Sequence, residues 1–269
     1  MRLGPVSLRQ AYTERTSMCG RYLITSAPEA FRRFFGYREE PSFPPRYNVA
    51  PTQPVPIVRM VEGARQFALV RWGLVPPWVR DPRNFSLLVN ARAESVNDKP
   101  AFCNAMRRRR CLFPADGFYE WKDKGAGRKR PFCVRPKDHG PVAFAGLWEC
   151  WMGPNGEEVE TAAIITTNAS RDIANLHSRM PVVIAPDAYD LWLDCARCDA
   201  LTASALLTPA PERLFEAYEV SPAVNRTANE GPELIEPVSA PVGEPPAPAT
   251  LKPRKPKDER QPSLFDDLA

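Results

Sequence analysis

The feature that most constrains this fold is a series of short strand-like runs without long helices between them. Runs rich in β-branched and aromatic residues occur at Val55–Val61, Gln66–Trp72, Cys111–Pro114, Gly117–Trp121, Phe132–Arg135, Val142–Trp148 and Val159–Thr167. Helix signals are few and do not alternate with these runs. The pattern predicts an α+β fold, a single β-rich domain of short mixed strands with a few helices.

Two local patterns make specific predictions. Ser26 and Glu29 have the spacing of a capping box, Pro28 suits a first helical turn, and Gly36 suits a helix end. A helix is therefore expected between them. The segment Trp72–Trp78 is apolar and contains two prolines, so we expect a rigid, exposed aromatic loop.

Proline is unevenly distributed along the 269 residues and marks the domain organisation. Residues 1–17 show no periodicity and are interpreted as a leader or as a start codon assigned too far upstream. Residues 18–231 form the expected domain. Residues 232–260 are rich in proline and charge, which predicts a disordered basic linker. Residues 261–269 end in an apolar patch typical of a peptide that binds a partner's groove.

The net charge is +4, and two clusters, Arg107–Arg110 and Lys122–Arg130, indicate either a polyanion partner or a solvated basic face. No apolar run has the length of a membrane span or the core of a signal peptide. We therefore expect a cytoplasmic protein with no membrane partner, associated with the nucleoid if the source is bacterial.

Seven cysteines at irregular spacings are typical of a reducing compartment. Cys195 and Cys198 form a C-x-x-C motif, but no second pair follows. The only histidines are His139 and His177, so neither a zinc site nor any other metal or cofactor is expected.

Cys19 carries the most distinctive chemistry if its α-amine is free. The amine and thiol then form a β-aminothiol, whose amine condenses with an aldehyde to an imine before the thiolate closes a thiazolidine ring. A nearby acid–base group is expected, because both groups react unprotonated. Taken alone, Cys19 is more commonly a buried structural cysteine.

Six motifs place Cys19 in a wider pattern. In chain order they are Met18-Cys19-Gly20-Arg21, Tyr47-Asn48-Val49-Ala50-Pro51-Thr52, Trp72-Gly73-Leu74-Val75-Pro76, Asn90-Ala91-Arg92-Ala93-Glu94, Gly117-Phe118-Tyr119-Glu120-Trp121 and His177-Ser178-Arg179-Met180-Pro181. Over about residues 18–224 the chain resembles the SOS-response-associated peptidase (SRAP) family, whose members shield abasic sites in single-stranded DNA. The resemblance implies a covalent cross-linking enzyme, although the family name describes a peptidase.

The resemblance implies four catalytic residues. Cys19 would form the thiazolidine cross-link, and Glu120 would be the acid–base carboxylate. His177 would assist sugar ring opening and proton transfer, and Asn90 would orient the cysteine and the sugar.

It also implies contacts to single-stranded DNA that carries an abasic site. Arg21, Arg92 and Arg179 would contact phosphates, Pro51 would belong to the DNA-binding surface, and Trp78 would stack on an unpaired base or wedge beside the lesion.

One departure from the family pattern affects the chemistry. Family members carry the cysteine directly after the initiator Met, whereas 18 residues precede Cys19 here. As printed, the Cys19 nitrogen is an amide and cannot form an imine. We expect translation from Met18 with Met removal, or else cleavage of the Met18–Cys19 bond. The family name implies that such a cleavage is self-cleavage.

Two other functions fit the same residues. A cysteine peptidase would use Cys19, His177 and Asn90 as nucleophile, base and orienting group. A non-catalytic reader of modified or single-stranded DNA would use the basic clusters and Trp78, and would survive loss of Cys19.

The tail suggests a second partner. Gln261, Ser263, Leu264 and Phe265 are similar to the short motif by which bacterial DNA-repair proteins bind the replication sliding clamp. The glutamine would bond at the edge of a groove that Leu264 and Phe265 fill, and the alternative is an inert C-terminus.

Overall fold

The structure, a computed structural model, describes residues 19–123, 125 and 129–238. Its strands are β1 (Tyr22–Ile24), β2 (Arg46–Val49), β3 (Pro54–Val61), β4 (Ala64–Trp72), β5 (Asn90–Arg92), β6 (Arg110–Ala115), β7 (Gly117–Asp123), β8 (Lys129–Pro136), β9 (Val142–Met152), β10 (Glu158–Asn168), β11 (Arg179–Pro181), β12 (Val183–Ile184) and β13 (Phe215–Glu219). The α-helices are α1 (Pro28–Phe35), α2 (Cys103–Arg108), α3 (Tyr189–Leu193) and α4 (Ala200–Ser204). The 3₁₀ helices are η1 (Pro82–Asn84), η2 (Ala93–Ser95), η3 (Pro186–Ala188), η4 (Pro222–Asn225) and η5 (Pro232–Ile235).

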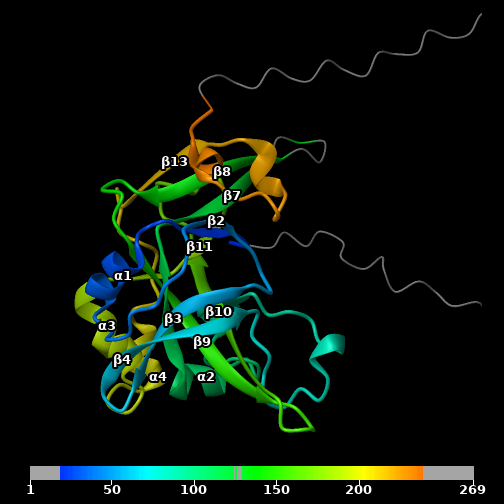
Figure 1. The fold of residues 1–269 in the computed structure, drawn as a ribbon. Helices are drawn as coiled ribbons and strands as arrows, with labels where there is room; N and C mark the ends of the chain where they lie inside the picture. The colour runs from blue at the N-terminus through cyan, green and yellow to red at the C-terminus, as the bar shows by residue number, and fades with distance from the viewer. Residues whose placement is uncertain (1–18, 124, 126–128, 239–269) are drawn as a thin grey trace, which may run out of the picture. The chain divides into compact units, whose positions relative to one another are not determined.

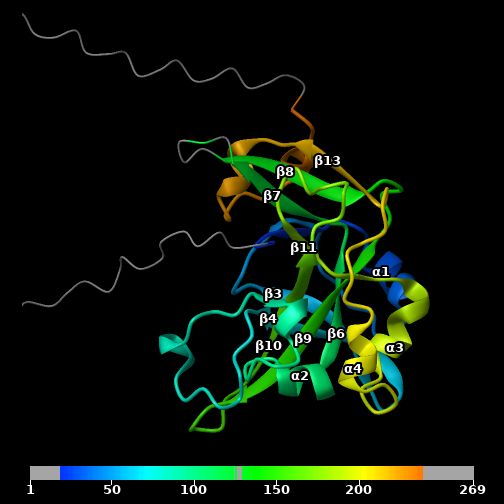
Figure 2. The ribbon, with the colours of Figure 1, turned by 180° about the vertical axis from the view of Figure 1, so that it is seen from behind.

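Strands β3, β4, β10, β9 and β6 pair in a closed ring, in which β6 is labelled in Figure 2 and the others in Figure 1. The β3–β4 hairpin turns at Glu62 and Gly63, whose φ angles of 49° and 76° are those of the turns that favour hairpins. β10 pairs in parallel with β4 and β5 and antiparallel with β9 and β11. Long strands, short helices and mixed pairing confirm the α+β prediction.

A second sheet, in the order β13-β8-β7-β1-β2, lies at one end of this ring in Figures 1 and 2. Tyr22 of β1 connects it to the ring, because its side chain packs edge-on against Trp72, Phe113 and Phe144 at centroid distances of 5.2, 6.5 and 6.4 Å. β1 pairs antiparallel with β7, with Tyr22 opposite Phe118. This register brings the residues before β1 next to the middle of β7.

Helix α1 forms at the predicted place, but its start differs from the prediction. Ala27 is the N-cap and no side chain caps the helix. The Ser26 hydroxyl instead donates to Asp116, which also accepts the Ser26 backbone N–H at 2.8 Å. The capping-box prediction is wrong because a buried carboxylate from a distant segment competes for the serine. Gly36 does end the helix, with φ 72°.

The helices α1 and α3 lie side by side in both views (Figures 1 and 2), and the Phe35 ring stacks on Tyr189 at 5.5 Å. Within the described ranges, the helices are all too short or too polar to cross a membrane.

The predicted exposed loop at Trp72–Trp78 is exposed only near its end. Trp72 is fully buried and its indole N–H donates to the Val89 carbonyl at 3.1 Å. Val75 packs with Trp151, whereas Trp78 is 58% exposed and contacts Phe85 edge-on. The prediction was therefore wrong for most of the segment, because β4 extends to Trp72 and carries its first residues into the core.

Arg110 corrects the interpretation of Arg107–Arg110 as a solvent-facing basic cluster. Its side chain is buried, and its guanidinium donates to the carbonyl oxygens of Met106, Trp192, Asp194 and Cys198. Arg110 is thus a structural residue that donates hydrogen bonds to carbonyls at the ends of α2, of α3 and of the turn that follows α3.

The folded domain continues past the expected boundary at residue 231. Leu234, within η5, is buried against Leu23, Tyr119 and Val224, and Pro237 pairs with Val220. Residues 232–237 therefore belong to the domain rather than to the linker. Residues 1–17, residues 239–260 of the expected linker and the 261–269 peptide lie outside the described residues.

Candidate functional site

Cys19 and Glu120 form the centre of the site, although 101 positions separate them in the chain. The β1–β7 register places the residues before Tyr22 beside Glu120. The backbone nitrogen and the Sγ of Cys19 both donate to the same Glu120 oxygen, Oε1, each at 3.0 Å. One buried carboxylate oxygen therefore contacts both reactive atoms of an aminothiol.

Burial shapes the acid–base properties of this pair. Both side chains are 3% exposed. Burial raises the pKa of the Cys19 thiol well above its ordinary value, the charge of Glu120 adds to this, and the charge of Arg179 opposes it. Burial also raises the pKa of Glu120, against the hydrogen bond from Cys19 and the charge of His177. Glu120 therefore keeps its proton to a higher pH than an exposed glutamate.

His177 follows β10 and lies close enough for its charge to act on Glu120. Its Nδ1 accepts the backbone N–H of Arg179 at 3.0 Å. In the neutral ring this bond leaves the hydrogen on Nε2, so the ring offers a donor on its other side.

Arg179, in β11, is held by the protein itself. Its guanidinium forms a two-pronged ion pair with Glu94 and donates to the Asn168 side chain at 3.1 Å and the Thr166 carbonyl at 2.6 Å. The Arg179 side chain is only 12% exposed. Sequence reasoning assigned no role to Glu94 or Asn168; Glu94 lay in a quoted motif, but the pairing needs the fold.

Residues of β5, η2 and β11, and of the segments next to them, line a cleft of about 730 Å³. It is polar and contains more cationic than anionic side chains. Its lining residues are Arg92, Glu94, Ser95, Lys99, Asn168, His177, Ser178 and Arg179. Three residues predicted from the sequence, Arg92, His177 and Arg179, therefore share one surface.

Asn90 begins β5, opposite Ile164 of β10, in the same strand as Arg92. Pro51 lies in the turn between β2 and β3, and Trp78 in the loop after β4. Neither Pro51 nor Trp78 lines the cleft.

Arg21 does not line the cleft either, and its side chain forms hydrogen bonds within the domain. Its Nη1 donates to the Asn48 side chain and to the Val224 carbonyl, the latter at 2.7 Å. Asn48 in turn donates to the carbonyls of Arg226 and Asn229, at 3.0 and 2.9 Å. The asparagine of the Tyr47–Thr52 motif thus fastens the C-terminal part of the domain.

In the described ranges 19–123, 125 and 129–238, no group of three or more His, Cys, Asp or Glu side chains is arranged to hold a metal ion.

Comparisons with known proteins agree on one family. The sequence profile described as "SOS response associated peptidase (SRAP)" matches residues 18–227. The chain is 36% identical over 222 residues to "Abasic site processing protein YoqW" of Bacillus subtilis (strain 168), covering 81% of this chain and 99% of the relative. It is 30% identical over 264 residues to "Abasic site processing protein HMCES" of Gallus gallus, covering 82% of this chain and 78% of the relative.

Solved structures show the same fold. A protein from Bacteroides thetaiotaomicron matches with a TM-score of 0.74 at 23% identity, covering 82% of this chain and 100% of that one. A protein from Bordetella bronchiseptica matches with a TM-score of 0.65 at 27% identity, covering 76% and 100%. Because the profile covers most of the chain and the relatives match over most of their length, the chain belongs to the SOS response associated peptidase (SRAP) family.

Proposed function

We propose that this protein captures abasic sites in single-stranded DNA by forming a covalent thiazolidine through Cys19. The observation that carries the proposal is the double contact of Cys19 nitrogen and sulfur with one Glu120 oxygen, each at 3.0 Å. The names of the relatives, abasic site processing proteins, support the same substrate.

The chemistry follows from the positions of these atoms. The open form of an abasic site carries an aldehyde at C1′. The Cys19 amine adds to it, and the resulting carbinolamine loses water to give an imine. The thiolate then adds to the imine carbon and closes the ring, so one water is lost overall. Glu120 can accept a proton from the amine or thiol and return it to the departing hydroxyl.

The raised pKa of Glu120 suits this exchange, because an acid works best when its pKa lies nearer the working pH. His177 presents Nε2–H as a donor, which suits a hydrogen bond to the sugar ring oxygen during ring opening. Asn90 is proposed to orient the sugar from the start of β5.

DNA is proposed to run along this polar cleft, whose Arg179 and His177 act by their charges on Cys19 and Glu120. Arg92 and Lys99 line this cleft and are exposed, so their side chains can contact DNA phosphates. Arg179 is less exposed and forms an ion pair with Glu94. Its charge acts on the Cys19 thiol, and it is proposed to contact a phosphate as well. Trp78, 58% exposed, is proposed to stack on an unpaired base outside the cleft.

The reaction requires an unacylated Cys19 nitrogen, and the printed chain has Met18 before it. We propose that translation from Met18 with Met removal supplies the free amine. Cleavage of the Met18–Cys19 bond is the second route. Both give the same reactive residue.

The geometry argues against a cysteine-peptidase mechanism. Such a mechanism needs a thiol activated by a histidine, with a lowered pKa. Here the Cys19 thiol donates to Glu120, and burial raises its pKa.

The experiment is incubation of the purified protein with single-stranded DNA that carries one abasic site, followed by a denaturing gel. Cys19→Ala should bind the DNA but give no shifted band, whereas Cys133→Ser, a matched change at another buried cysteine, should give the wild-type band. DNA with a tetrahydrofuran in place of the abasic sugar should give none. An adduct formed by Cys19→Ala would rule out the proposed bond.

We further propose that residues 261–269 bind a sliding clamp through Gln261, Ser263, Leu264 and Phe265. Deletion of these residues should abolish clamp capture in a pull-down and leave cross-linking intact. Replacement of Leu264 and Phe265 by alanine should have the same effect. Unchanged capture would end this proposal.

A further inference from the structure

The Cys195–Cys198 motif has no part in the proposed cross-linking. Neither cysteine lines the polar cleft that contains His177 and Arg179. It forms a single helical turn directly after α3. The Cys198 N–H donates to the Asp194 carbonyl at 3.0 Å, and Asp194 Oδ1 accepts the N–H groups of Ala196 and Arg197, both at 3.0 Å. The turn is therefore capped at its start and closed at its end.

One buried guanidinium holds both ends of this turn. Nη2 of Arg110 donates to the carbonyl oxygens of Asp194 at 3.2 Å and Cys198 at 2.7 Å. In an α-helical turn the Cα atoms of residues three apart lie about 5 Å from one another. A disulfide requires Cα atoms about 4.4–6.8 Å apart, so the pinned turn holds Cys195 and Cys198 at a suitable spacing.

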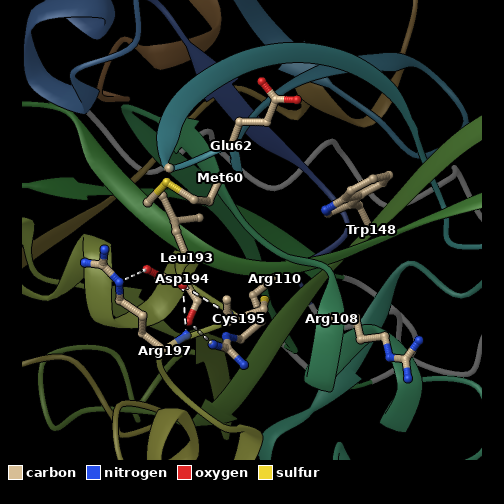
Figure 3. Close-up of a pocket in the computed structure, with 11 residues that line it drawn as sticks. Met60, Glu62, Arg108, Arg110, Trp148, Leu193, Asp194, Cys195 and Arg197 are labelled. Atoms are coloured by element: carbon tan, nitrogen blue, oxygen red, sulfur yellow. Dashed lines mark hydrogen bonds and ion pairs between the residues drawn. The ribbon is translucent and has the colours of Figure 1, made fainter.

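A cavity of about 420 Å³ gives small molecules access to this turn (Figure 3). Cys195 lines the cavity, whereas Cys198 is buried and does not line it. Met60, Trp148 and Leu193 form its apolar walls. The lining also holds the exposed Arg108 and Arg197, the second paired with Asp194 at 3.5 Å. With Arg110, these cations outnumber the lining carboxylates of Glu62 and Asp194, which favours a ligand with negative charge.

Among the described residues, no cluster of three or more metal-ligating side chains includes this motif. Neither thiol is joined in a disulfide in the structure. We propose that Cys195 and Cys198 are a dithiol pair that undergoes thiol–disulfide exchange with a small anionic disulfide, of the glutathione class, admitted by this cavity.

The exchange balances without a further reactant. The Cys195 thiolate attacks one sulfur of the small disulfide, forms a mixed disulfide and releases one small thiolate. Cys198 then attacks the Cys195 sulfur and releases the second. The two protons of the protein thiols end on the two small thiols. The small disulfide is thereby reduced, and the protein gains one disulfide.

The test uses the full chain, treated with glutathione disulfide, alkylated, digested and mapped by mass spectrometry. The wild type should lose two hydrogens, with the new disulfide joining Cys195 and Cys198. Cys198→Ser should stop at a mixed disulfide on Cys195. Cys103→Ser, a change at another half-buried cysteine, should behave as the wild type. Cys19→Ser should also form the Cys195–Cys198 disulfide, because the exchange does not involve Cys19. If the exchange fails, the proposed cross-linking through Cys19 is therefore unaffected.

The charge of the ligand gives a second arm. The Arg108→Gln, Arg197→Gln double variant should react about threefold or more slowly with glutathione disulfide. Its rate with uncharged hydroxyethyl disulfide should be unchanged. The proposal is overturned if both thiols remain alkylatable, if Cys195 pairs with the buried Cys111, or if the double variant slows both reagents equally.

Discussion

Replacement of Glu120 by glutamine separates acid–base chemistry from the geometry of the site. Glutamine has nearly the same shape and keeps an oxygen that accepts from the nitrogen and sulfur of Cys19, now 3.0 Å away. It cannot exchange a proton. General acid–base catalysis contributes about 10²–10⁴-fold, so the rate of cross-linking to an abasic single strand should fall by that factor.

The same variant should gain stability at neutral and alkaline pH. Burial raises the pKa of Glu120, so the folded chain binds this proton more tightly than the unfolded chain. The contribution of Glu120 to the free energy of unfolding is therefore full below the unfolded pKa of about 4.3, and it is lost as the pH rises through the raised folded pKa.

Each tenfold difference in proton affinity between the folded and the unfolded chain changes the free energy of unfolding by about 1.4 kcal/mol. For a domain of this size, that corresponds to about 3–6 °C in Tm. Melting curves between pH 4 and 9 should show Glu120→Gln overtaking the wild type as the pH rises.

The matched control is Glu149→Gln. Glu149 is also buried with a raised pKa, but it contacts Arg109 and Asn104 instead of Cys19. Its replacement should leave the cross-linking rate unchanged. If Glu120→Gln cross-links within about threefold of the wild type, or if both variants slow equally, Glu120 is not the acid–base group.

Three other changes test separate parts of the structure. Arg110→Met removes the donor for four carbonyls and should lower the free energy of unfolding by about 3 kcal/mol or more, measured by urea denaturation; a loss below about 1 kcal/mol would contradict this role. Arg92→Gln should reduce the slope of log affinity against log salt by about 0.7 on single-stranded DNA. Arg33→Gln, which changes an exposed side chain of α1, should leave this slope unchanged. Trp78→Ala should weaken DNA binding by about 1–3 kcal/mol without changing Tm, because this side chain is 58% exposed; a lower Tm would show that it packs in the domain.

Sequence patterns predicted the local structure well because strand alternation and hairpin turns are local. The runs Val55–Val61 and Gln66–Trp72 form β3 and β4, with the turn at Glu62 and Gly63. Closure of the ring was not predictable, since it depends on β10 pairing with both β4 and β9. No local pattern specifies such long-range pairing.

The site shows the same division. Cys19 and Glu120 were chosen separately through resemblance, but their shared contact follows from the β1–β7 register. The Glu94–Arg179 pair joins η2 to β11, and sequence spacing carries no signal for it. Ser26 was misassigned because Asp116, 90 residues away, offers it a better partner than the helix end.

Intact-protein mass spectrometry tests the central claim most directly. The purified protein is measured alone and after mixing with single-stranded DNA that carries one abasic site. The proposed mechanism predicts a protein that begins at Cys19 and gains the mass of the DNA less one water. An adduct on protein that retains Met18, or a protein that begins at Cys19 and gains no mass, would contradict it.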